Sequence, residues 1–230
     1  MITAILVDGA FYQRQAYLLF GEKSPKDRAI ELIKYCRRHV AKEGGELYRI
    51  FYYDCPPSDK TVFHPLTQKT VSLLKSPQYK WQMEFISELA SKRKVAVRRG
   101  EPLESSGSYM LRPDAVKKLC RRTITVDDLK ETDFYLDIKQ KGVDMRLGLD
   151  IASLAYKRQV SQIVLIAGDS DFVPAAKHAR REGIDFILDP MWHSISPSLN
   201  EHIDGLHSCV AKPPNNSADP LCIKNSDQQT

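Results

Sequence analysis

The chain has 230 residues, of which 42% are hydrophobic, and a formal net charge of +5 at pH 7. This length and composition predict one domain with a substantial core, or one domain with an added segment. No run of eighteen apolar residues occurs, so no membrane span is expected, and Met1–Val7 lacks the charged leader of a signal peptide. The five cysteines are scattered without a CxxC pair, which favours reduced thiols and a cytoplasmic protein.

The first strand signal is the apolar run Ala4–Val7, which ends in Asp8 and Gly9. Asp8 has two interpretations at this point. It is either a turn or helix-cap residue, or a carboxylate presented at the edge of a sheet.

Two helices and a strand are predicted next. An aromatic-rich helix covers Phe11 to Phe20, and a second helix begins at the N-cap Ser24 and continues to Val40. Leu47 to Asp54 predicts a strand. Asp54 is assigned a structural or peripheral role, because the prolines that follow it lead the chain away.

Residues 55 to about 130 break the alternation of strands and helices and are predicted to form a basic α/β insertion. They contain 15 Lys and Arg against 8 Asp and Glu. Lys92, Arg93 and Arg98 flank a predicted strand, and we expect them to contact a polyanion; the alternative is that such charges simply face solvent. The aromatic residues of this region could stack on unpaired bases, or form local core: Tyr79, Trp81 and Tyr109.

A strong helix is predicted from Met145 to Arg158, after the breaker Gly142. Asp144 stands at its start, either as a plain N-cap or as a metal ligand that points into a cleft. Asp150 lies about 240° around the helical wheel from Asp144 and therefore faces elsewhere, so a supporting role is predicted for it.

The most informative stretch is the apolar run Ile163–Ala167, followed by Gly168, Asp169 and Asp171. The run predicts a buried strand, and a helix is expected after it. The two carboxylates therefore stand at the carboxyl end of a central strand, where open α/β sheets bind their ligands. Carboxylates held this close repel one another unless a cation lies between them.

The chain ends with a predicted strand at Gly183–Asp189, a short closing helix, and a polar terminus. The domain is accordingly assigned to residues 1–210, and residues 211–230 are predicted to be a disordered tail.

Four carboxylates from three distant segments thus predict a site for one or two Mg²⁺ or Mn²⁺ ions: Asp8, Asp144, Asp169 and Asp171. Metal ions placed there would activate a water and stabilise the leaving oxygen of a phosphodiester. The six histidines lie outside these motifs, so zinc is not expected. No P-loop or GxGxxG occurs, so a nucleotide cofactor is not expected either.

These motifs resemble the NYN domain family, in the LabA-like branch of the PIN-like nucleases, and in particular its bacterial members. The resemblance rests on Val7-Asp8-Gly9, Tyr52-Tyr53-Asp54-Cys55-Pro56-Pro57, Lys141-Gly142-Val143-Asp144 through Leu149-Asp150, and Gly168-Asp169-Ser170-Asp171-Phe172.

The resemblance implies a PIN-like three-layer α/β/α sandwich with a mainly parallel central sheet. It also implies metal-dependent cleavage of RNA, with Asp8, Asp144, Asp169 and Asp171 as the acidic set. Ser170 matches a polar position beside them, and Lys141 and Arg146 are further candidates for substrate contact. The chain departs from the family in one respect: many members carry an asparagine two or three residues after the first glycine, where this sequence has Phe11 and Tyr12.

Three functions remain open on the sequence alone. The first is a Mg²⁺- or Mn²⁺-dependent endoribonuclease, and the second is an RNA-binding or regulatory module with weak or no catalysis. The third, a metal-dependent phosphatase, is disfavoured because the usual DxD nucleophile motif is missing at Asp8-Gly9-Ala10. The choice between RNA and DNA, and between monomer and homo-oligomer, is left open.

Overall fold

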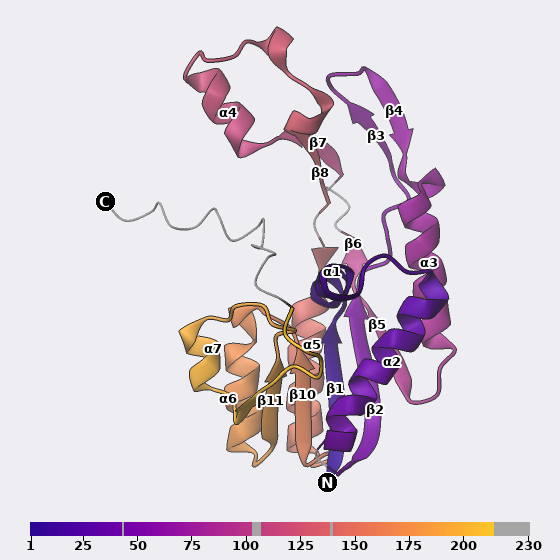
Figure 1. Cartoon of the computed structure of the whole chain (residues 1–230), viewed down its shortest axis with the longest axis vertical. Helices are drawn as coiled ribbons and strands as arrows, with labels where there is room; N and C mark the ends of the chain where they lie inside the picture. Colours follow the sequence, from indigo (N-terminus) through magenta and orange to yellow (C-terminus); the bar gives the residue numbers. More distant parts are fainter. Residues whose placement is uncertain (43, 103–106, 139, 214–230) are drawn as a thin grey trace.

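The computed structural model describes residues 1–42, 44–102, 107–138 and 140–213. Its main body is a six-stranded parallel sheet with helices on both faces, and a smaller lobe projects from one end (Figure 1). The strands are β1 (Ile2–Asp8), β2 (Glu46–Asp54), β3 (Thr61–His64), β4 (Lys69–Ser72), β5 (Val95–Arg99), β6 (Glu101–Pro102), β7 (Ser108–Leu111), β8 (Phe134–Asp137), β9 (Gln140–Lys141), β10 (Gln162–Ile166), β11 (Asp185–Asp189) and β12 (Gly205–Leu206).

The helices confirm most of the predicted segments within a few residues at each end. They are α1 (Gly9–Phe20), α2 (Pro25–Lys42), α3 (Pro77–Ala90), α4 (Pro113–Cys120), α5 (Val143–Tyr156), α6 (Val173–Arg181) and α7 (Pro197–Glu201), with short 3₁₀ turns η1 (Leu73–Lys75), η2 (Val126–Asp128), η3 (Glu131–Asp133) and η4 (Ser170–Phe172).

The order of the strands in the main sheet is β12-β11-β10-β1-β2-β5, and every pair is parallel. The chain builds outward from β1 in one direction through β2 and β5, and then in the other through β10, β11 and β12. The order therefore reverses between β1 and β10. Ligands of open α/β sheets bind at such a switch point, outside the carboxyl ends of the strands.

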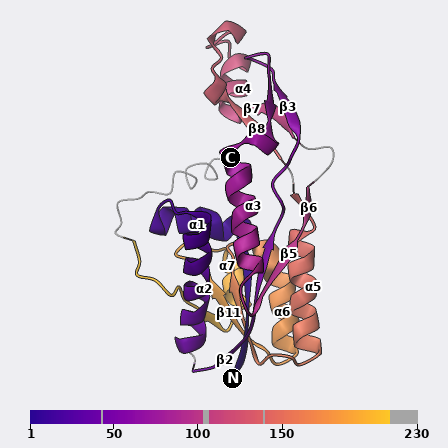
Figure 2. The same ribbon diagram turned by 90° about the vertical axis from the view of Figure 1, so that its right-hand side faces the viewer.

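Alternation along the strands divides the core into two layers. In β1, Ala4 and Leu6 pack against α5, α6 and α7, whereas Ile5 and Val7 pack against α1, α2 and α3. Figure 2 shows the two helical layers on opposite sides of the sheet. The predicted three-layer α/β/α sandwich is thus confirmed.

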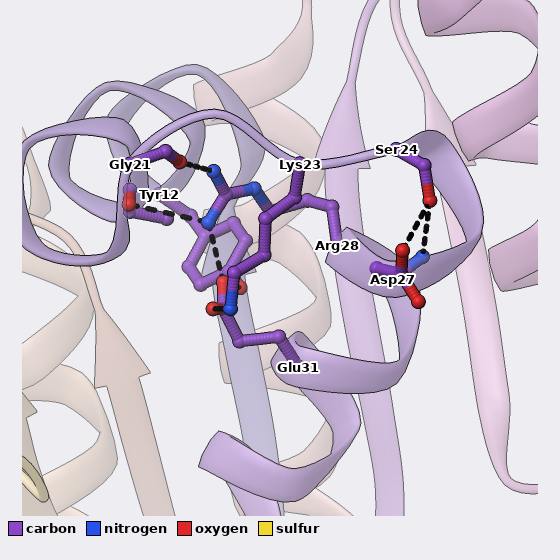
Figure 3. A network of polar contacts seen from close by, with 8 residues as sticks. Tyr12, Gly21, Lys23, Ser24, Asp27, Arg28 and Glu31 are labelled. Carbon is purple, nitrogen blue, oxygen red and sulfur yellow. Dashed lines mark hydrogen bonds and ion pairs between the residues drawn. The ribbon is translucent and has the colours of Figure 1, made fainter.

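The corner between α1 and α2 is fixed by a buried arginine (Figure 3). The Arg28 guanidinium donates to the carbonyl oxygens of Ala16 and Gly21 and to the carboxylate of Glu31. Tyr12 donates to the same carboxylate from α1. These bonds tie the carboxyl end of α1 to α2, and α1 begins directly after Asp8.

Two elements within the predicted insertion belong to the main body. β5 extends the sheet beside β2, and α3 packs on the face that α1 and α2 also cover. The lobe consists of the β3–β4 hairpin, the β7–β8 pair and α4, and it lies beyond the carboxyl ends of the sheet strands (Figure 1). Ring contacts of His64 with Tyr109 and Phe134 hold its two strand pairs together.

The start of α1 requires a glycine. A Cβ at position 9 would lie 2.6 Å from the carbonyl oxygen of Tyr53 and 2.6 Å from the Tyr52 ring, and backbone cannot yield. Gly9→Ala should therefore lower the free energy of unfolding by about 1–3 kcal/mol, measured by urea denaturation. Gly148→Ala is the matched control: that Cβ meets nothing within 4 Å, so helix propensity should raise stability by about 0.5–1 kcal/mol. Equal effects would contradict the close approach at Gly9.

Within the described residues, no helix combines the length and the apolar character that crossing a bilayer requires. Residues 211–213 follow the last turn without regular structure. The rest of the predicted tail, 214–230, lies outside the described residues.

Candidate active site

Asp8 ends β1 at the switch point. Its carboxylate caps α1 by accepting a hydrogen bond from the backbone N–H of Phe11 at 3.1 Å. Alternation along β1 places its side chain on the face of the sheet that α5 covers. The capping interpretation is therefore correct, and it leaves the second carboxylate oxygen for other partners.

Asp144 lies in the first turn of α5 but does not cap it. The N-cap is Gly142, whose φ of 80° suits a glycine, and no side-chain capping bond forms there. The pKa of the Asp144 carboxyl is raised; shielding from water is the largest cause, and the charges of Asp169 and Asp171 add to it. An exposed carboxylate without a capping role is available to a ligand.

Asp169 and Asp171 follow β10 in the turn η4. Asp169 is the N-cap of this turn, and its Oδ1 accepts from the backbone N–H of Asp171 at 3.0 Å. Ser170 stands between them, and all three residues are exposed. Gly168 lets the backbone before Asp169 lie close to Phe11, because a Cβ at position 168 would be 2.6 Å from the Phe11 ring.

The four predicted aspartates share one electrostatic environment. The pKa of Asp8 is raised to about 6, chiefly by burial, and the charges of Asp144 and Asp54 raise it further. Asp144 in turn is influenced by Asp169 and Asp171. The structure thus brings together carboxylates from β1, α5 and the β10–α6 turn, which are far apart in sequence.

The carboxylates are near one another without being in contact. Among the described residues, no three acidic oxygens lie within 4.8 Å of one another. Mg²⁺ keeps several of its waters and is bound through one or two carboxylates together with substrate phosphate, so it does not require three carboxylates in contact. The donor set, all carboxylate oxygen, suits Mg²⁺ or Mn²⁺.

The raised pKa of Asp8 predicts how the metal-free protein responds to pH. Because the carboxyl titrates at about 6 in the folded chain and near 3.8 when unfolded, the folded state holds the proton more tightly between these values. Its contribution to the free energy of unfolding should fall as the pH rises from about 4 to about 6. Asp8→Asn keeps an acceptor for the Phe11 N–H, and should raise stability at neutral pH by about 1–3 kcal/mol in EDTA.

Urea denaturation of both proteins across this pH range is the measurement. At the acid end, where the wild-type carboxyl is protonated, the two proteins should converge. Parallel pH profiles would contradict the assignment of the raised pKa to Asp8.

Asp54 ends β2, one strand away, and its side chain lies on the other face of the sheet. It is 4% exposed and accepts four hydrogen bonds, from Gln13 Nε2, Tyr52 Oη, Gln82 Nε2 and the Cys55 N–H. Three of these bonds go to Oδ2 and one goes to Oδ1, so the carboxylate orients these groups, which agrees with the structural role predicted from the sequence.

A pocket of about 470 Å³ opens beside Asp54. Its walls come from α1, α3, the prolines after β2, and the lobe: Ala10, Gln13, Gln82, Tyr79, Pro56, Pro57, Leu136 and Ile138 are among them. Of the three aromatic residues considered for stacking, Tyr79 lines this pocket. Trp81 stacks on Phe85 and Tyr109 packs on His64, so both are local core.

The basic residues predicted to contact substrate lie in different surroundings. Lys92 and Arg93 precede β5 and therefore lie at the amino ends of the strands. The aspartates lie at the carboxyl ends, so the structure does not bring these two residues to the site. Arg98 is held by Asp150 at 2.8 Å and lies over the Phe51 ring. Arg146 in α5 is exposed. Its partner Glu101, in β6, lies 3.5 Å away and is also exposed. The side chain of Lys141 lies outside the described part of the chain.

Two arginines near the site were not singled out by the sequence. Arg14 is exposed on α1, and its charge lowers the pKa of Asp8. Arg99 is exposed at the carboxyl end of β5, in register with Asp54. The available signal for Arg14 was its spacing of six residues from Asp8 on a predicted helix.

The family described as NYN domain matches residues 3–208. The chain belongs to the NYN domain family. The match confirms the resemblance and the PIN-like nuclease fold; NYN domains act on RNA and generally depend on divalent metals.

Other comparisons give less. No curated protein matches the chain significantly. Among solved structures, the chain is similar to a protein of unknown function from Vibrio parahaemolyticus, with 15% sequence identity, coverage of 89% of this chain and 90% of that chain, and a TM-score of 0.44. The assignment to the LabA-like branch and to bacterial members stays a prediction.

The departure from the NYN pattern has a structural explanation. Phe11 is buried against Gly168 and meets the His193 ring edge to face, and the buried Tyr12 donates to Glu31. In this NYN domain both side chains are therefore part of the core, and neither is a polar group in the acidic site.

Proposed function

We propose that this NYN domain is a Mg²⁺- or Mn²⁺-dependent endoribonuclease whose metal site is formed by Asp8, Asp144, Asp169 and Asp171. The observation that supports it most is the convergence of these carboxylates at the switch point of the sheet. When bound there, a divalent cation lowers the pKa of a coordinated water and offsets the charge that develops on the phosphate.

The chain's own residues have separate parts in this proposal. The aspartates would hold the cation, and the bond from the Phe11 N–H orients the carboxylate of Asp8. Ser170 would contact a phosphate or a water, and Arg14, Arg99 and Arg146 would bind the RNA backbone. The pocket beside Asp54 would take a nucleotide next to the scissile bond, with Tyr79 available for stacking. A cytoplasmic location belongs to the same proposal.

The test is cleavage of a labelled single-stranded RNA by the purified chain with Mg²⁺, Mn²⁺ or EDTA. We expect internal cleavage with either metal and none with EDTA. A DNA of the same sequence, run in parallel, determines which nucleic acid is preferred.

The second candidate is an RNA-binding or regulatory NYN domain without turnover. Phe11 and Tyr12 favour it, because both are buried and the Tyr12 hydroxyl is engaged with Glu31, so neither supplies a group to order a water at the site. Salt-dependent RNA binding without cleavage in any divalent metal would select this candidate over the first.

Arg14→Ala should weaken RNA binding about 3- to 10-fold and reduce the slope of log K against log salt by about one, because one phosphate contact is lost. Fluorescence anisotropy in the Asp144→Asn background measures binding without cleavage. Arg93→Ala is the matched control, because Arg93 lies at the amino ends of the strands. The affinity of this variant for RNA should be unchanged. A larger loss of RNA affinity for Arg93→Ala would mean that RNA binds at the amino ends of the strands, which would contradict this proposal.

A further inference from the structure

Three metal-ligating side chains meet away from the aspartates. They are His39 in α2, and His207 and Cys209 in the segment after β12, and their ligand atoms all lie within 4.8 Å of one another. Nδ1 of His39 is 3.3 Å from Nε2 of His207. Two nitrogens on a tetrahedral zinc with bonds of 2.0–2.1 Å would be roughly 3.4 Å apart, so the histidines already have the spacing of zinc ligands.

A buried carboxylate sets the orientation of His39. Nε2 of His39 lies 2.7 Å from Oδ2 of Asp189, and both side chains are fully buried. Because a carboxylate accepts the hydrogen, the proton of His39 resides on Nε2, and the lone pair of Nδ1 faces His207. Zinc-binding histidines are held by carboxylates in this same way.

Asp189 is itself held firmly at the end of β11. Tyr35 Oη donates to Oδ2, while Ser208 Oγ and the Met191 N–H donate to Oδ1. Ser208 stands between the two other candidate ligands, so this bond also fixes the segment that carries them.

Further bonds hold the segment after β12 against α2 and against the turn that follows β11. Arg38 donates to the carbonyl oxygen of Cys209, and Trp192 Nε1 donates to that of Val210. His207 and Cys209 are half-buried, whereas His39 is fully buried. The cluster is thus built on fixed backbone and can be reached from solvent on one side.

We propose that His39 Nδ1, His207 Nε2 and Cys209 Sγ form a binding site for a thiophilic divalent cation of the Zn²⁺ class. Two imidazoles and a thiolate select such a cation over Mg²⁺, and water completes the fourth position. Binding releases the Cys209 thiol proton and replaces the hydrogen bond between the two rings, and the proton on His207 Nε2 moves to His207 Nδ1 through solvent, which leaves the Nε2 lone pair for the cation. The cation would join α2 to the end of the domain, and this role is independent of the acidic site. Zinc is not expected from the sequence, because the histidines lie outside the aspartate motifs and His39 is 168 residues away from His207 in the chain.

The test uses Co²⁺ as a spectroscopic probe of the full chain, freed of metal with EDTA and kept reduced. We expect a thiolate-to-cobalt charge-transfer band and the visible bands of tetrahedral cobalt, saturating at one equivalent and lost when Zn²⁺ is added. The charge-transfer band reports a sulfur ligand, so cobalt in the carboxylate site does not produce it.

Variants then identify the ligands. Cys209→Ser should abolish the charge-transfer band, and His207→Ala should weaken cobalt binding by more than about 100-fold. Cys120→Ser, at an exposed cysteine in α4, is the matched control and should behave as wild type. Circular dichroism verifies folding of each variant. Absence of the band from the wild-type chain, or its persistence in Cys209→Ser, would overturn the proposal.

Discussion

Asp144→Asn should lower the rate of metal-dependent RNA cleavage by at least about 100-fold and leave the free energy of unfolding within about 0.5 kcal/mol of wild type. The carboxylate is exposed, makes no capping bond, and lies in the field of Asp169 and Asp171. The amide has the same shape but no charge with which to hold a cation. Single-turnover cleavage with Mn²⁺ and urea denaturation give the two numbers.

Asp150→Asn is the matched control on the same helix. Its carboxylate accepts from Tyr53 Oη and from Arg98, each at 2.8 Å. Weakening these bonds should lower stability by about 1–2 kcal/mol, while cleavage at saturating metal stays near the wild-type rate. If the two variants exchanged these phenotypes, the assignment of Asp144 to the metal site would be wrong.

Asp189→Ala should be the most destabilising of the substitutions considered, with a loss of about 3–5 kcal/mol in the free energy of unfolding. The carboxylate is fully buried and satisfies donors from Tyr35, His39, Ser208 and the Met191 backbone. Alanine leaves these donors buried without an acceptor. Urea denaturation in EDTA measures the effect without any contribution from bound metal.

Asp185→Ala, at the other end of the same strand, provides the comparison. It loses one hydrogen bond, from Gln162 Nε2 at 2.7 Å, and should cost about 1 kcal/mol. Similar losses for both variants would show that the network around Asp189 contributes little.

The sandwich could be predicted from the sequence because its signals are local. Apolar runs such as Ile163–Ala167 become strands that are buried on both faces, and Ser24 caps α2 as its position suggests. The sequence pattern predicts β5 to be part of an insertion, because a polar loop, the β3–β4 hairpin and α3 separate it from β2. Its place in the sheet depends on pairing across that distance, which local pattern does not encode.

The clustering of the four aspartates could be predicted for a related reason, whereas their binding of a metal ion stays a prediction. Asp8 ends β1, Asp144 lies in the first turn of α5, and Asp169 and Asp171 lie in the turn between β10 and α6. Parallel strands bring such positions to the same end of the sheet. The locations of Lys92 and Arg93 could not be inferred, since a charge run does not reveal which end of a strand faces the ligand. The pairing of His39 with Asp189 spans 150 residues and depends on where α2 crosses the sheet, which only the structure reveals.

The most direct test of the metal site is a crystal structure of the chain soaked in Mn²⁺, with anomalous scattering used to locate the ion. We expect an anomalous peak between the carboxylates of Asp144 and Asp169, at about 2.2 Å from at least one oxygen of each, and within reach of Asp8 or Asp171 through water. Saturating Mn²⁺ without a peak at this edge of the sheet would contradict the proposed site.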